Sequence, residues 1–141
     1  MESKASMSLL INRGGITSAD DLDKWGSKNI PGYLGVIEKK QLAKMPFVHG
    51  RSWIINMDDR AGTHWVAMRV SDKKHAVLYI DSFGMPPEDI VIQAAWKHKL
   101  PIWYTDTDYQ GLHEENCGQR ALHVLKSLSE RPSDWDYFKT L

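Results

Sequence analysis

The residues from 64 to 81 read HWVAMRV, SDKK and HAVLYID, two runs rich in β-branched, aliphatic and aromatic residues around a short polar segment. This pattern predicts two antiparallel strands joined by a tight turn. Apolar residues occupy successive positions in both runs, so both faces of the hairpin are largely apolar. We therefore expect the hairpin to lie centrally in a sheet that is covered on both sides.

The turn decides which residues of the two strands face each other. Whether the loop holds two or four residues, Val70 faces His75, and His64 then faces Asp81. Directly opposed side chains point to the same face, with Cβ atoms about 4.5 to 5.5 Å apart. The hairpin therefore predicts that an imidazole meets a carboxylate.

The remaining segments complete an α+β pattern. Ser18, three residues before Asp21, is typical of a capping box that opens a helix through Trp25. Apolar spacing predicts further helices over 88–98 and 118–128, and strands over 51–56 and 102–104. We expect a central, mostly antiparallel sheet packed by helices, with Cys117 in the first turn of the last helix.

Composition indicates one ordinary globular domain over residues 1–141, with roughly the first 15 residues loosely ordered. Neither a membrane span nor a secretory signal is recognisable, so we expect a protein that is not secreted and makes no membrane contact. The formal net charge is +0, which provides no overall field for nucleic acid. The single cysteine excludes an internal disulfide and favours a reducing compartment.

Cys117 is a candidate nucleophile. A thiol needs help to ionise at neutral pH, and the N-terminus of a helix stabilises a thiolate through its unpaired N–H groups and macrodipole. A nearby His64 imidazolium would add to that effect, and Asp81 would fix the tautomer of His64, as the third member of a triad does.

Two further residues suit acyl transfer. The backbone N–H of Cys117 and the side-chain amide of Gln110 are candidate donors to an oxyanion. Gly118 has no Cβ beside the nucleophile, which we interpret as room for the backbone of a substrate. These roles predict a cysteine protease.

The order His64-Trp65, Asp81, Gln110 and Cys117-Gly118 resembles the adenovirus protease (adenain) family, including proteases of polinton-like elements, virophages and other large DNA viruses. The resemblance extends to 31–36 (PGYLGV) and 79–84 (YIDSFG), and covers roughly 22–128. It implies a papain-like arrangement in permuted chain order and an endopeptidase that matures virions. Its partners would be capsid or core precursors cut at small glycine-containing sites, in a virion or in the nucleus or cytoplasm of a host cell.

The chain also departs from that family. The adenovirus enzyme is activated by a disulfide-linked peptide and by DNA. Here Cys117 is the single cysteine, so no further thiol exists to link a peptide, and the neutral net charge does not favour DNA binding. We therefore expect no cofactor. Scattered histidines lack the paired spacing of zinc ligands, so no metal is expected either.

Other interpretations stay open at this stage. SUMO proteases share a similar order of His-Trp, Asp, Gln and Cys-Gly, which makes a deconjugating protease the alternative enzyme. A non-catalytic binding module with the same fold is the alternative of another class, in which Cys117 is a buried structural thiol. His113, four residues before Cys117, is a rival base.

Overall fold

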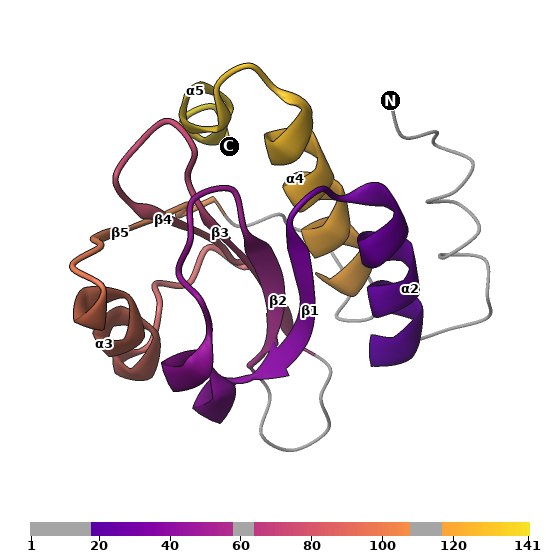
Figure 1. The fold of residues 1–141 in the computed structure, drawn as a ribbon, viewed down its shortest axis with the longest axis horizontal. Helices are drawn as coiled ribbons and strands as arrows, with labels where there is room; N and C mark the ends of the chain where they lie inside the picture. Colours follow the sequence, from indigo (N-terminus) through magenta and orange to yellow (C-terminus); the bar gives the residue numbers. More distant parts are fainter. Residues whose placement is uncertain (1–17, 58–63, 108–116) are drawn as a thin grey trace.

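The computed structural model describes residues 18–57, 64–107 and 117–141. Five strands form one sheet in the order β1-β2-β3-β4-β5, which is also their order along the chain (Figure 1). The strands are β1 (Tyr33–Glu38), β2 (Ser52–Asn56), β3 (Trp65–Val70), β4 (Val77–Ile80) and β5 (Ile102–Tyr104). The helices are α2 (Ala19–Asn29), the 3₁₀ helix η1 (Lys39–Lys44), α3 (Asp89–Lys97), α4 (Cys117–Glu130) and α5 (Asp134–Phe138).

The sheet is mixed, which corrects the expected mostly antiparallel arrangement. Strand β3 is antiparallel to both β2 and β4, whereas β1–β2 and β4–β5 are parallel pairs. Parallel neighbours need a crossover connection, and here η1 lies between β1 and β2, and α3 lies between β4 and β5. The α+β class is as expected.

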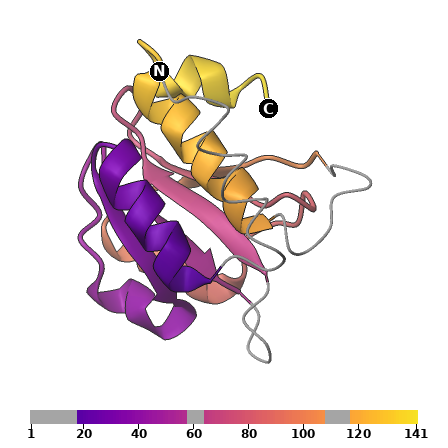
Figure 2. The same ribbon diagram turned by 90° about the vertical axis from the view of Figure 1, so that its right-hand side faces the viewer.

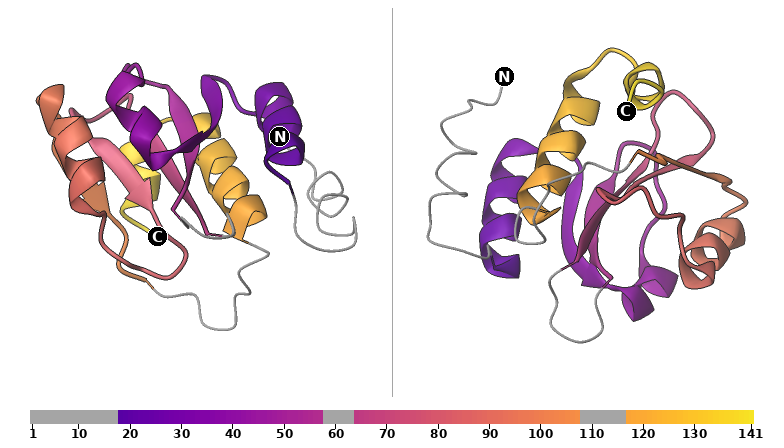
Figure 3. Two further views of the ribbon diagram at one scale, coloured as in Figure 1. Left: turned by 90° about the horizontal axis from the view of Figure 1, so that it is seen from below. Right: turned by 180° about the vertical axis from the view of Figure 1, so that it is seen from behind.

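Helices cover both faces of the sheet (Figure 3). Figure 2 shows α2 and α4 side by side on one face, where α5 also contributes Phe138 to the core. On the other face, α3 and η1 pack on the alternate side chains of the same strands, which point away from α2 and α4. Every residue of β3 and β4 is buried, as the two apolar faces of the hairpin predict.

The register of the β3–β4 hairpin differs from the prediction. Val70 faces Val77, and Ala67 faces Ile80, so β4 is displaced by two residues and His75 belongs to the loop. A displacement of two keeps every side chain on its predicted face, because the side-chain period of a strand is two. His64 and Asp81 therefore become diagonal neighbours instead of direct ones.

Ser71 is the cause of the longer turn. Its Oγ accepts the backbone N–H groups of Lys73 at 3.1 Å and Lys74 at 3.0 Å, while its own N–H donates to the carbonyl of Ala76 at 3.0 Å. The same Oγ donates to Asp134 of α5 at 2.7 Å. A helix distant in sequence thus helps to set the turn, which no local turn rule could include.

The N-terminal helix agrees with its predicted cap. Ser18 Oγ accepts the N–H of Asp21 at 3.1 Å, which satisfies one of the donors that a helix start leaves unpaired. The helix continues beyond Trp25 to Asn29, and Ile30 is its C-cap, directly before Pro31. The predicted helices at 88–98 and 118–128 and the strand at 102–104 correspond to α3, α4 and β5.

Candidate active site

The candidate site lies at the end of the sheet where β3 begins and β4 ends. Nε2 of His64 lies 3.2 Å from each carboxylate oxygen of Asp81 and hydrogen-bonds to Oδ2. A carboxylate only accepts, so this contact assigns the ring proton to Nε2. The histidine side chain is 21% exposed and that of the aspartate 4%, so a buried anion orients a ring that solvent reaches.

A tight turn after β4 holds the carboxylate. The N–H of Phe83 donates to Asp81 Oδ1 at 2.9 Å, and the N–H of Gly84 donates to the Asp81 carbonyl at 2.9 Å. Gly84 has φ 72°, and a Cβ there would lie 2.8 Å from the carbonyl oxygen of Asp106. Only glycine fits this position without strain.

Phe83 is a positioning residue that sequence reasoning missed. Its ring stacks on the imidazole of His64 with centroids 5.1 Å apart and planes at 23°. One residue therefore contacts both members of the pair, the carboxylate through its backbone and the imidazole through its ring. Phe83 lies in the turn after β4, two residues beyond Asp81, where the strand pattern gives no direction for a side chain.

The first turn of α4 packs against Trp65, the residue that follows His64. A Cβ at Gly118 would lie 3.0 Å from Leu22 Cδ1 and 3.3 Å from Trp65 Cδ1. Trp65 directly follows His64, so the start of the helix lies against the histidine-bearing end of β3. The missing Cβ faces the core, which corrects the interpretation that Gly118 makes room for a substrate: the glycine lets α4 approach the sheet.

Tyr79 lies two residues before Asp81 on β4 and is 1% exposed. Burial raises the pKa of its phenol well above the usual value, and the negative charges of Asp81 and Glu88 add to that increase. The phenol therefore stays neutral at ordinary pH.

The predicted site residues are not all described. His64 and Asp81 are in contact, while Cys117 is described only by its backbone, as the first residue of α4. Gln110 and the rival base His113 lie outside the described residues. Within the described ranges, no cluster of three or more His, Cys, Asp or Glu side chains is placed to hold a metal ion. None of the described helices is long and apolar enough to cross a membrane.

The sequence matches no protein-family model and no curated protein.

Proposed function

We propose that this chain is a cysteine endopeptidase in which Cys117 is the nucleophile, His64 the base and Asp81 the residue that orients the base. One observation carries the proposal: a solvent-accessible imidazole is held by a buried carboxylate 3.2 Å away, at the end of β3 against which the first turn of α4 packs. Core histidines that serve packing alone do not require a buried anion beside them.

The contact with Asp81 determines which ring nitrogen reacts. With Nε2 held by the carboxylate, Nδ1 accepts the thiol proton of Cys117, and the buried charge of Asp81 stabilises the resulting imidazolium. The helix start stabilises the thiolate. The sulfur then attacks the peptide carbonyl, and the C–N bond breaks as Nδ1 returns the proton to the leaving amine.

The second half of the reaction uses the same residues. Water gives a proton to Nδ1 and adds to the thioester carbon, the C–S bond breaks, and the thiol is restored with release of the acid. The N–H of Cys117 and the amide of Gln110 would bind the oxyanion in both steps, each contributing about 3 to 4 kcal/mol of transition-state stabilisation.

The proposed fold family and substrate follow from the motifs in the sequence. The order of base, carboxylate, Gln110 and nucleophile is similar to that of the adenain-like proteases, a papain-like arrangement in permuted order. We infer from this that the substrates are viral capsid or core precursors cleaved at small glycine-containing sites during virion maturation.

The test combines three reagents with the purified chain: a fluorogenic Gly-Gly peptide, a SUMO or ubiquitin conjugate, and iodoacetamide. We expect cleavage of the peptide, and rapid alkylation of Cys117 near about pH 6 to 7 because the thiol is ionised there. Only one cysteine exists, so alkylation reports on a single site.

The Cys117→Ser variant serves as the control and should retain the fold while losing cleavage. Faster turnover of the conjugate than of the peptide would identify a deconjugating enzyme instead. Slow alkylation with no cleavage of either substrate would identify a non-catalytic module, and activity equal to wild type in Cys117→Ser would end the assignment.

A further inference from the structure

Two lysine-rich turns, far apart in sequence, meet at the end of the sheet opposite the candidate active site. One is the β3–β4 turn, 73–75 (KKH), and the other follows α3 at 97–99 (KHK). Nε2 of His75 lies 3.1 Å from the carbonyl oxygen of Lys99, which places the two turns in contact. The chain is neutral overall, so this end of the molecule is a local concentration of positive charge.

The carboxylates at this end are already engaged. Asp72 and Asp134 both pair with Arg69 at 2.8 Å, and Asp136 pairs with Lys139 at 3.3 Å. Within the part of the chain that the structure describes, the lysines of the two turns make no ion pair. These residues are Lys73, Lys74, Lys97 and Lys99.

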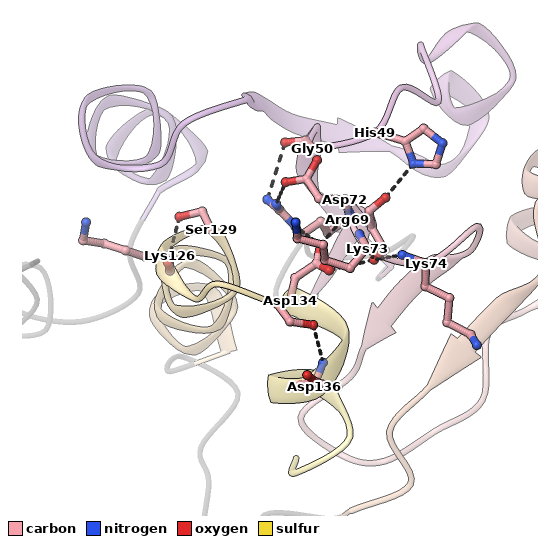
Figure 4. A network of polar contacts seen from close by, with 12 residues as sticks. His49, Gly50, Arg69, Asp72, Lys73, Lys74, Lys126, Ser129, Asp134 and Asp136 are labelled. Atoms are coloured by element: carbon pink, nitrogen blue, oxygen red, sulfur yellow. Dashed lines mark hydrogen bonds and ion pairs between the residues drawn. The ribbon is translucent and has the colours of Figure 1, made fainter.

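Lys74 is distinct among these lysines because it is partly buried. Its side chain extends away from Arg69 and Asp72 (Figure 4), and its ammonium lies 4.3 Å from the ring centre of Trp135 and 5.3 Å from that of Trp103. The two indoles meet edge to face, with centroids 5.3 Å apart. Aromatic faces stabilise a cation without supplying a negative charge, so this contact leaves the ammonium open to an anionic partner.

A hollow of about 470 Å³ opens beside Lys74. Its lining consists of Lys74, His75, Pro101, Ile102 and Trp103. Trp103 is 47% exposed although it belongs to a strand. The hollow thus combines an uncompensated cation with an aliphatic and aromatic wall.

We propose that this hollow binds a peptide segment in which an acidic side chain neighbours a hydrophobic one. The acidic group would pair with Lys74, and the hydrophobic group would lie on Ile102 and Trp103, so each part of the lining has a partner of matching chemistry. The site is independent of the proposed catalysis, since it lies at the far end of β3, about 20 Å away for a strand of this length.

A nucleic acid fits this surface less well. Binding to single strands uses aromatic faces on which successive bases stack along a basic groove. Here the indoles of Trp103 and Trp135 meet edge to face, so they offer no run of parallel ring faces along which successive bases could stack.

The experiment titrates the isotope-labelled full chain with an acetylated, amidated peptide, Glu-Leu-Glu-Phe, and follows backbone and indole N–H resonances by NMR. The matched peptide Gln-Leu-Gln-Phe has the same shape without charge. We expect shifts confined to 71–76 and 99–103 and to the indoles of Trp103 and Trp135, both of which Lys74 contacts, with binding about tenfold weaker for the neutral peptide because a charge-assisted contact is lost. Added salt should weaken binding to wild type.

Variants assign the charge to one residue. Lys74→Gln should weaken binding of the acidic peptide about tenfold, Lys74→Arg should retain it, and Lys44→Gln, which removes a charge from η1, should change nothing. The proposal is overturned by equal binding of the two peptides, by shifts outside the two segments and the two indoles, or by the absence of any shift. It is also overturned if oligothymidylate binds more tightly than the acidic peptide and loses that advantage in Lys74→Gln. The salt dependence of wild type tests the proposal even if Lys74→Gln disturbs the indole pair.

Discussion

Each end of the β3–β4 hairpin has a basic side chain in contact with a carboxylate, and the two pairs differ in their partners. At the turn end, the Asp134 side chain is 1% exposed and receives hydrogen bonds from Arg69 Nε, Ser71 Oγ and the N–H of Asp72, all between 2.7 and 2.8 Å. At the open end, Asp81 receives the N–H of Phe83 and the ring of His64. Both carboxylates are buried and hydrogen-bonded.

The difference lies in the cationic partner. Arginine keeps its proton at any ordinary pH, so the Arg69–Asp134 pair is a permanent ion pair that joins α5 to the hairpin. Histidine gains and loses a proton near neutrality, and the His64 side chain is 21% exposed. Under the proposed function, the hairpin therefore has a permanent structural pair at one end and a proton-exchanging pair at the other. The variants below are designed to test this division.

The largest expected effect is the loss of activity in His64→Ala. Removal of the base should lower kcat by on the order of 10⁶-fold, nearly as much as loss of Cys117, because the two act as one unit. The midpoint of thermal unfolding should change little, since the ring is partly exposed. His98→Ala, which removes a histidine that stacks on Phe47, is the control. If His113→Ala were inactive and His64→Ala active, the base would be misassigned.

Asp81→Asn should lower kcat by about 10⁴-fold, less than loss of the base, because the ring keeps its place but loses the preferred tautomer. Peptidase kinetics measure this change. The double variant His64→Ala, Asp81→Asn should be no worse than His64→Ala alone. Additive losses would show that Asp81 acts independently of His64.

Asp134→Asn should do the reverse and lower the free energy of unfolding by at most about 3 to 5 kcal/mol, because the buried Arg69 loses its buried anion and keeps only the half-exposed carboxylate of Asp72. Denaturant titration measures the loss, and turnover per folded molecule should equal that of wild type. The exposed neighbour provides the control: Asp136→Asn should change stability by less than about 1 kcal/mol, since surface pairs contribute little. A loss of turnover in folded Asp134→Asn would show that the Arg69–Asp134 pair is not purely structural, and the contrast between the two ends would fail.

Acid should weaken the turn end selectively. Burial alone would raise the pKa of Asp134, but the hydrogen bonds from Arg69, Asp72 and Ser71 hold it below the usual value. A lowered folded pKa gives stability that is present above the unfolded pKa, about 3.9, and is lost as pH falls through the folded value. Unfolding free energies measured from about pH 6 to pH 2 should fall less steeply in Asp134→Asn than in wild type. Parallel curves would contradict this assignment.

The smallest effect is expected for Phe83→Leu. Loss of the ring stack should lower kcat/KM by roughly tenfold, because such contacts contribute about 0.5 to 1.5 kcal/mol. Phe83→Tyr should restore it, and the pH–rate profile should shift in the leucine variant alone. Phe47→Leu removes an equivalent stack on His98, with centroids 4.7 Å apart, and should leave the profile unchanged. A shift in both variants would show a general loss of packing.

The hairpin also shows how far sequence reasoning reaches. The two strands, their burial and their shared faces follow from residue pattern, because alternation is a local property. The register did not, since Ser71 is tied to Asp134 of α5, and this contact is invisible to a rule that considers only the turn. The predicted contact between His64 and Asp81 is present despite the wrong register, because a displacement of two residues keeps each side chain on the same face of the sheet.

Contacts between distant elements account for the other differences. The parallel pairing of β5 with β4 depends on where α3 crosses, and the role of Gly118 depends on Leu22 and Trp65. Neither is encoded near the residue concerned. The sequence motif marks Gly118 as important, but only packing shows that it sets the distance between a helix and a sheet.

The order of the strands has a consequence for how the molecule is assembled. Because spatial order follows chain order, the sheet can grow by addition at its edge as the polypeptide leaves the ribosome, without threading or rearrangement. All five strands precede α4, so His64 and Asp81 can be in place before the helix that begins with Cys117 docks. Under the proposed function, the docking of α4 would then be the step that brings Cys117 to a base and carboxylate already in place.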